Sequence, residues 1–129
     1  AVLIVDDDAL MRATLRERVL RAGYRPVEAD GPAAGLAALE RDSAIGLVLS
    51  DIRMPTTGDG IAFIRAVRRR WPALPVAAVT GYPGDLDALH GTPECPVLIL
   101  PKPFRASQIE EVLRLALHPP ASGSAAGPG

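Results

Sequence analysis

The sequence has one cysteine, no long apolar run and almost no net charge, and each of these features argues against a class of protein. Cys95 alone cannot form a disulfide within the chain, which disfavours a small secreted fold held by disulfides. No apolar run approaches the roughly 20 residues that cross a bilayer. Fourteen Lys and Arg against fifteen Asp and Glu leave a net charge of −1, so no global field attracts nucleic acid or membrane. We therefore expect a cytoplasmic domain that binds neither directly.

Length and composition predict one globular domain followed by a tail. A chain of 129 residues that is 48% hydrophobic and 22% charged can bury a core, but it is too short for two enzymatic domains. Residues 119–129 read PPASGSAAGPG and contain no bulky apolar side chain, so they cannot offset the entropy lost on ordering. We expect a domain over residues 1–117 and a flexible tail or linker over 118–129. Because Ala1 enters a strand-like run without an initiator Met, we also expect a longer parent protein.

Short apolar runs alternate with helix-period segments, which predicts an α/β fold. The runs do not alternate with polar residues, which is typical of strands buried on both faces. Strands are expected over residues 2–5, 47–49, 76–79 and 97–100, with a weaker candidate at 26–29. Helices are expected over residues 9–22, 32–42, about 61–71 and 107–117, with only a short or irregular one at 85–90. This order requires right-handed crossovers and therefore a parallel sheet between two helical layers.

Residues with reactive or charged side chains follow the predicted strands. Ligands of open α/β sheets bind beyond the carboxyl ends of the strands. The residues that would meet at this edge are Asp6, Asp7, Asp8, Asp51, Thr80 and Lys102. Two carboxylates 4 Å apart repel by about 4 kcal/mol at an effective dielectric near 20, so a cation is needed there. We predict that Asp8, in front of a helix, is an N-cap.

Oxygen ligands without histidine or cysteine favour Mg²⁺ over zinc at this edge. A hydroxyl from Thr80 and an ammonium group from Lys102 would hold the remaining oxygens of a phosphoryl group. Asp51 is then the predicted nucleophile, and its product would be an acyl phosphate. The sequence therefore predicts Mg²⁺-dependent phosphoryl transfer.

Four segments resemble the receiver domain of two-component response regulators, in the CheY-like superfamily, over residues 1 to about 117. These segments are VLIVDDDALMR, LVLSDIRMP, VAAVTGY and LPKPF. The resemblance implies a flavodoxin-like, doubly wound, five-stranded parallel sheet in the order 2-1-3-4-5. It implies a module that takes a phosphoryl group from a phosphohistidine on a histidine kinase or histidine phosphotransfer protein, switches conformation and slowly hydrolyses its own phosphoryl group. It does not imply a stand-alone metabolic enzyme, and it is compatible with a weak homodimer.

The resemblance also implies residue roles. The implied metal ligands are Asp6, Asp7, Asp51 and the backbone carbonyl of Arg53. The implied catalytic residues are the acceptor Asp51, Thr80, which hydrogen-bonds the phosphoryl group, and Lys102, which pairs with it. The Lys102–Pro103 peptide bond is expected to be cis.

Two positions depart from the family pattern. Gly60 lies five residues after Pro55 instead of four, so one residue is inserted near Gly58, beside the site. Ile99 stands where Tyr or Phe is common, so an aromatic rotamer switch is not available. These departures affect the expected geometry of the loop and the way in which a partner would recognise the phosphorylated state.

Alternative interpretations stay open at this point. A pseudo-receiver would have the fold but bind partners without phosphorylation. A Mg²⁺-dependent phosphohydrolase would need a second acid two residues after the nucleophile, where Arg53 stands. The arginines at 65 and 68–70 could form a nucleic-acid patch, but a basic last helical turn is favoured by the helix dipole alone. The parent chain could be a hybrid histidine kinase, a free-standing regulator or a regulator with an output domain.

Overall fold

The computed structural model describes residues 1–52, 57–81 and 97–117 of the chain, without the side chains of residues 57 and 58. The strands are β1 (Val2–Val5), β2 (Pro26–Ala29), β3 (Leu47–Asp51), β4 (Val76–Thr80) and β5 (Leu98–Pro101). The helices are α1 (Ala9–Arg21), α2 (Pro32–Arg41), α3 (Thr57–Arg70) and α4 (Ala106–Leu117). The helix expected at 85–90, the tail expected at 118–129 and the expected ligand Arg53 lie outside the described residues.

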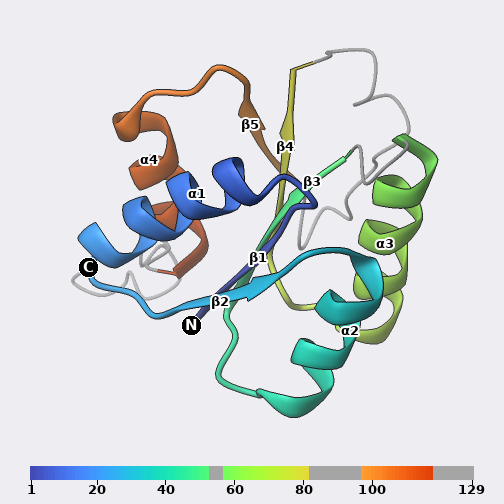
Figure 1. Ribbon diagram of the computed structural model, residues 1–129. Helices are drawn as coiled ribbons and strands as arrows, with labels where there is room; N and C mark the ends of the chain where they lie inside the picture. The colour runs from blue at the N-terminus through green and yellow to red at the C-terminus, as the bar shows by residue number, and fades with distance from the viewer. Residues whose placement is uncertain (53–56, 82–96, 118–129) are drawn as a thin grey trace.

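All five strands are parallel and form one sheet in the order β2-β1-β3-β4-β5 (Figure 1). This confirms the predicted fold class and strand order. The chain leaves β1 for the neighbouring β2 and then returns to the other side of β1 as β3, so the winding reverses between β1 and β3. Val5 of β1 is in register with Ser50 of β3, which brings Asp6 and Asp51 side by side where both strands end. This is the crevice in which open α/β sheets bind ligands.

Helices cover both faces of the sheet, with α1 and α4 on one side and α2 and α3 on the other (Figure 1). Side chains alternate between the faces, so Val2 and Ile4 pack with α1 and α4 while Leu3 and Val5 pack with α2 and α3. All four residues of β1 are fully buried. Burial on both faces explains why the strand reads as an unbroken apolar run.

Local signals at the two ends of α1 set its length. The Oδ1 atom of Asp8 accepts hydrogen bonds from the backbone N–H groups of Leu10 at 2.9 Å and Met11 at 3.3 Å, which confirms the predicted N-cap. At the other end Gly23 has a φ of +93° and follows the C-cap residue Ala22, a conformation that glycine adopts readily. The helix therefore begins beside the acidic residues and stops before β2.

Helix α3 begins earlier than its apolar stripe predicted, at residue 57 instead of about 61. Its first turn lies against the backbone that follows β3. A Cβ atom built on Gly60 would lie 1.7 Å from the carbonyl oxygen of Ile52, so only glycine fits at this contact. The close approach places α3 directly over the residue that follows Asp51. Throughout the described residues, every helix is too short or too polar to span a bilayer.

Candidate functional site

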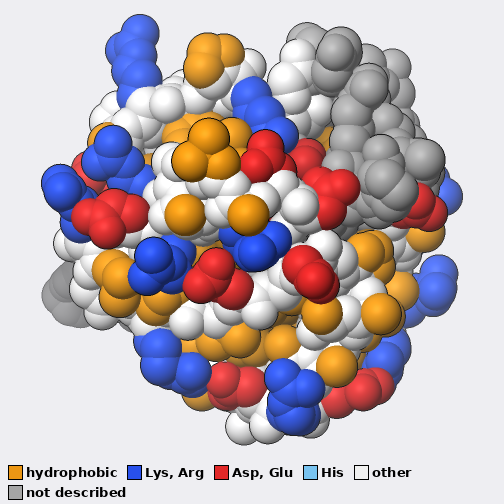
Figure 2. All heavy atoms as spheres, in the orientation of Figure 1, with side chains coloured by type: hydrophobic (Ala, Val, Ile, Leu, Met, Phe, Trp, Pro, Cys, Tyr) orange, Lys and Arg blue, Asp and Glu red, His pale blue; other side chains and the backbone are white. Residues whose placement is uncertain are grey.

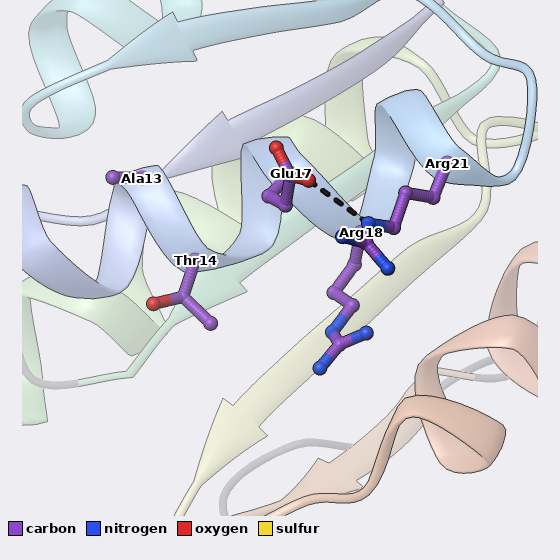
Figure 3. Close-up of a pocket in the computed structure, with 5 residues that line it drawn as sticks. All are labelled: Ala13, Thr14, Glu17, Arg18 and Arg21. Carbon is purple, nitrogen blue, oxygen red and sulfur yellow. Dashed lines mark hydrogen bonds and ion pairs between the residues drawn. The ribbon is translucent and has the colours of Figure 1, made fainter.

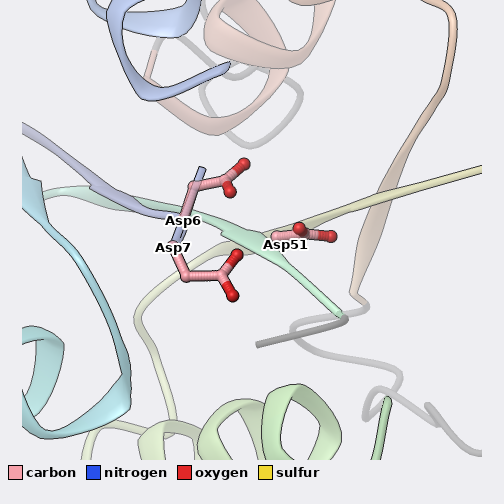
Figure 4. A group of neighbouring side chains, drawn as sticks. All are labelled: Asp6, Asp7 and Asp51. Atoms are coloured by element: carbon pink, nitrogen blue, oxygen red, sulfur yellow. The ribbon is translucent and has the colours of Figure 1, made fainter. Parts of the chain in front are cut away.

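Three carboxylates meet where β1 and β3 end. One oxygen each from Asp6, Asp7 and Asp51 lies within 4.8 Å of the others. Figure 4 shows the side chains of Asp6 and Asp7 turned toward Asp51. Asp6 and Asp51 are buried, whereas Asp7 is exposed. The structure thus brings together three of the four expected metal ligands.

Asp6 is the most deeply buried of the three acids. Its side chain is fully buried, and its Oδ1 atom accepts a hydrogen bond from the backbone N–H of Asp8 at 2.9 Å. Its Oδ2 atom is buried without a hydrogen-bond partner. Burial is the main reason that the pKa of Asp6 is raised to about 6. The nearby charges of Asp51 and Asp7 also raise it, whereas the Asp8 N–H and the Lys102 ammonium group lower it. A positive charge on the Oδ2 side would therefore stabilise the ionised form of this carboxylate.

The donor set fits a hard divalent cation. All three side chains offer carboxylate oxygens, which are the ligands of Mg²⁺, and the exposed Asp7 leaves one side open to water and substrate. A cation held there would give the Asp6 Oδ2 atom a partner and would reduce the repulsion among the three carboxylates. The unpartnered Oδ2 atom of Asp6 thus fits the Mg²⁺ site that the sequence predicts.

Lys102 reaches the same cluster from the end of β5. Its Nζ atom lies 3.4 Å from the Oδ1 atom of Asp51. Its backbone N–H donates a hydrogen bond to the carbonyl oxygen of Thr80 at 2.7 Å. The Lys102–Pro103 bond is cis, as expected. The backbone contact keeps the lysine beside the last residue of β4 while its side chain reaches across to β3.

Thr80 is the last residue of β4 and is 5% exposed. Asp51 is in register with Val79, so Thr80 stands one residue further along the neighbouring strand. Strand alternation places Thr80 on the α2 and α3 face together with Ala78, opposite the face of Val79. Its hydroxyl therefore belongs to the same edge as Asp51 but comes from the other face of the sheet.

Ile99, which stands where the family commonly has Tyr or Phe, is half-buried against the α2 and α3 core.

One residue near the site was not singled out by the sequence analysis. The Nη1 atom of Arg12 donates a hydrogen bond to the backbone carbonyl of Asp6 at 2.8 Å, and its Nε atom lies 3.5 Å from Glu28. A signal was present, because Arg12 lies near the N-terminus of α1, where the helix dipole disfavours a cation.

Surface features away from the acids do not add to this site. A hollow of about 340 Å³ lies on α1, and Glu17 and Arg21 form an ion pair of 2.9 Å at its edge. Figure 3 shows the residues that line it, which are Ala13, Thr14, Glu17, Arg18 and Arg21. A second hollow, of about 460 Å³, lies at the end of the sheet opposite the three acids. It includes Arg70, whose guanidinium group stands 4.5 Å from the Trp71 ring centre. Acidic and basic side chains are interspersed on the face seen in Figure 2.

Comparison with known proteins identifies the family. The family model described as "Response regulator receiver domain" matches residues 2–114. The chain belongs to this family. The receiver domain is 34% identical over 112 residues to the response regulator protein FleR of Pseudomonas aeruginosa. These residues make up 87% of this chain and 23% of FleR. It is 36% identical over 115 residues to the DNA-binding transcriptional regulator NtrC of Escherichia coli, covering 88% of this chain and 23% of NtrC.

Solved structures share the fold of this receiver domain. The chemotaxis protein CheY4 of Vibrio cholerae superposes with a TM-score of 0.76 at 25% identity, over 89% of this chain and 96% of that one. The receiver domain of NtrX from Brucella abortus gives a TM-score of 0.77 over 91% of this chain and 98% of that one, at 24% identity. The receiver domain spans about a quarter of the length of the relatives it matches in sequence.

Membership places the receiver domain in two-component signal transduction. Domains of this family generally bind Mg²⁺ in an acidic pocket and interact with histidine kinases or phosphotransfer proteins.

Proposed function

We propose that this receiver domain accepts a phosphoryl group on Asp51 from a phosphohistidine of a histidine kinase or histidine phosphotransfer protein. The observation that carries the proposal is the convergence on Asp51 of two further carboxylates and one ammonium group. An isolated aspartate at a strand end would require neither the two carboxylates nor the ammonium group beside it. The cluster instead supplies a place for a divalent cation and a positive charge for the incoming phosphoryl oxygens.

The transfer needs little covalent chemistry from the protein. A carboxylate oxygen of Asp51 attacks phosphorus, the P–N bond to the donor imidazole breaks, and the imidazole leaves with the bonding electron pair and takes up a proton. When bound, Mg²⁺ supplies positive charge that lets the anionic carboxylate approach the anionic phosphoryl group. Asp6, Asp7, Asp51 and the backbone carbonyl of Arg53 are the proposed metal ligands.

Lys102 and Thr80 are proposed to hold the transferred group. The ammonium group of Lys102 already lies beside Asp51, so it can pair with a phosphoryl oxygen after a small displacement. The hydroxyl of Thr80 would donate to another phosphoryl oxygen. Because Thr80 stands on the opposite face of the sheet, this bond would draw the end of β4 toward Asp51, which gives the domain a second conformation. The same contacts would be lost when water hydrolyses the acyl phosphate.

A direct test uses acetyl phosphate and beryllofluoride with Mg²⁺. Intact-mass spectrometry should show one added phosphoryl group in the native protein and in the control Asp30→Asn, whose carboxylate is exposed and outside the cluster. The adduct should be lost in Asp51→Asn. An undiminished adduct in Asp51→Asn would contradict the proposal. Turnover of phosphate esters would indicate a phosphohydrolase, and neither adduct nor beryllofluoride binding would indicate a pseudo-receiver.

The parent protein is also a matter of proposal. The relatives FleR, DctD and NtrC are named as a response regulator, a transcriptional regulatory protein and a DNA-binding transcriptional regulator. We therefore favour a cytoplasmic transcriptional regulator over a hybrid kinase as the parent chain, with residues 118–129 as a linker and DNA binding confined to another domain. The full open reading frame tests this: a downstream DNA-binding domain would support it, and an upstream kinase domain would contradict it.

A further inference from the structure

We propose that Arg12 is a positioning residue for the metal site. It would fix the peptide between Asp6 and Asp7 by tying the carbonyl of Asp6 to β2 through Glu28. This inference rests on the proposed function, because it concerns how the chain keeps its acidic pair ready for Mg²⁺.

The peptide groups around Asp6 are anchored on both sides. The N–H of Asp6 donates to the carbonyl of Ala29 in β2 at 3.1 Å, and the carbonyl of Asp6 accepts from Arg12 at 2.8 Å. The peptide unit is planar, so holding the Asp6 carbonyl also sets the direction of the Asp7 N–H and the positions of both Cα atoms. The directions in which the Asp6 and Asp7 side chains leave the backbone follow from these positions.

Arg12 is itself held by β2. Its Nε atom lies 3.5 Å from the Glu28 carboxylate, which a second arginine, Arg16, also contacts at 3.5 Å. Glu28 directly precedes Ala29 in β2. The same short strand therefore restrains Asp6 through a direct backbone bond and through a carboxylate–guanidinium bridge. The Arg12 side chain is 21% exposed, less than half the fraction for Arg16, so Arg12 is the more confined of the two.

The restraint acts just beyond the end of the paired strands. β1 ends at Val5, so its pairing with β3 stops before Asp6 and Asp7, while the Asp6 N–H keeps its bond to Ala29 of β2. These two acids and Asp51 have oxygens within 4.8 Å of one another, and their repulsion favours any movement that separates them. A hydrogen bond to the Asp6 carbonyl opposes that movement without occupying a carboxylate oxygen. The ligands therefore remain close together and available.

The position of Arg12 supports a role beyond helix stability. A cation near the N-terminus of α1 opposes the helix dipole. Groups that orient metal ligands without touching the metal often change metal affinity by about 10–100-fold when they are removed. Arg12 contacts the backbone of one proposed ligand, so we expect an effect at the lower end of that range, about tenfold.

The test compares Arg12→Ala with Arg16→Ala, which removes a guanidinium group from the same helix and the same Glu28 contact. Mg²⁺ dissociation constants are measured by calorimetry, urea unfolding is followed without Mg²⁺, and the Asp7 amide is followed by ¹⁵N NMR. Arg12→Ala should weaken Mg²⁺ binding about tenfold and shift the Asp7 resonance. Arg16→Ala should leave both unchanged, even where the two variants lose similar stability.

Equal Mg²⁺ affinity in Arg12→Ala and the native protein would overturn the inference, as would an equal loss in Arg16→Ala. If Arg12→Ala does not fold, Arg12→Lys and Glu28→Gln take its place, each expected to weaken Mg²⁺ binding by a smaller factor. Native affinity in both would overturn the inference. A native protein that fails to bind Mg²⁺ at all would overturn the proposed function itself, so the two failures are distinguishable.

Discussion

The Nζ atom of Lys102 lies 3.4 Å from the Oδ1 atom of Asp51, although 51 residues separate them in the chain. The two residues stand at the ends of β5 and β3, on either side of β4. The pair is asymmetric, because the side chain of Lys102 is 29% exposed and that of Asp51 only 9%. The lysine can therefore move with an incoming phosphoryl group while the aspartate stays in place.

Removing the Lys102 ammonium group should weaken binding of the phosphoryl mimic more than it weakens folding. A partly exposed ion pair contributes about 0–1 kcal/mol to stability, whereas a charge-assisted hydrogen bond to a bound anion contributes about 1.5–3 kcal/mol. We expect Lys102→Ala to lower beryllofluoride affinity at least about tenfold and Lys102→Arg to recover part of it. Calorimetric titration and urea unfolding measure the two effects, and unchanged affinity in Lys102→Ala would contradict the assigned role.

Asp6→Asn should stabilise the protein without Mg²⁺ at neutral pH. The pKa of Asp6 is about 6 in the folded chain against its ordinary value of 3.8, so the folded state holds this proton more tightly than the unfolded state. The stability that this proton contributes is complete below pH 3.8 and is lost as the pH rises through about 6. The amide oxygen of the introduced asparagine can still accept the Asp8 N–H, so the substitution mainly removes the charge.

We expect Asp6→Asn to raise the free energy of unfolding by about 3 kcal/mol near pH 7.5 and to have little effect near pH 4. Mg²⁺ should stabilise the native protein by mass action and lose this effect in the variant. Urea unfolding at the two pH values, with and without Mg²⁺, provides the measurement. A stability difference independent of pH would show that the carboxylate charge is not its cause.

Gly60→Ala should destabilise the protein, although alanine is the better helix former by about 1 kcal/mol. The added Cβ would lie 1.7 Å from the carbonyl oxygen of Ile52, and backbone on both sides must move to relieve the contact. We expect a loss of about 3 kcal/mol or more in the free energy of unfolding. Gly31→Ala is the matched control, because nothing lies within 4 Å of its added Cβ. Equal effects of the two substitutions would exclude the close approach as the cause.

Asp8→Ala should affect helix α1 and leave the metal site almost unchanged. Its carboxylate caps the N–H groups of Leu10 and Met11, and loss of an N-cap typically lowers stability by about 1 kcal/mol. Asp8→Ser should keep most of that stability because a hydroxyl can also accept these hydrogen bonds. Thermal unfolding and Mg²⁺ titration separate the two roles. A large loss of Mg²⁺ affinity in Asp8→Ser would make Asp8 part of the metal site.

Most secondary structure followed from local patterns because each pattern reflects a local physical requirement. The run at β1 is apolar throughout because both faces of that strand are buried, and α1 begins at a capping aspartate and ends before a glycine. The boundaries of β3 and α3 were less predictable. β3 extends to Asp51, and α3 begins at residue 57, before its first apolar contact with the core, because hydrogen bonding continues where the hydrophobic pattern has stopped.

The sequence alone determined which chemical groups gather at one end of the sheet, since parallel strands must bring their carboxyl ends to the same edge. Only the tertiary structure decided how these groups differ in burial and in their contacts. It buried Asp6 with an unpartnered oxygen, left Asp7 exposed, and placed the guanidinium group of Arg12 on the Asp6 carbonyl. It also set Gly60 against the backbone of Ile52. Burial and close contact depend on which surfaces pack together across the fold, and no local pattern of residues records that.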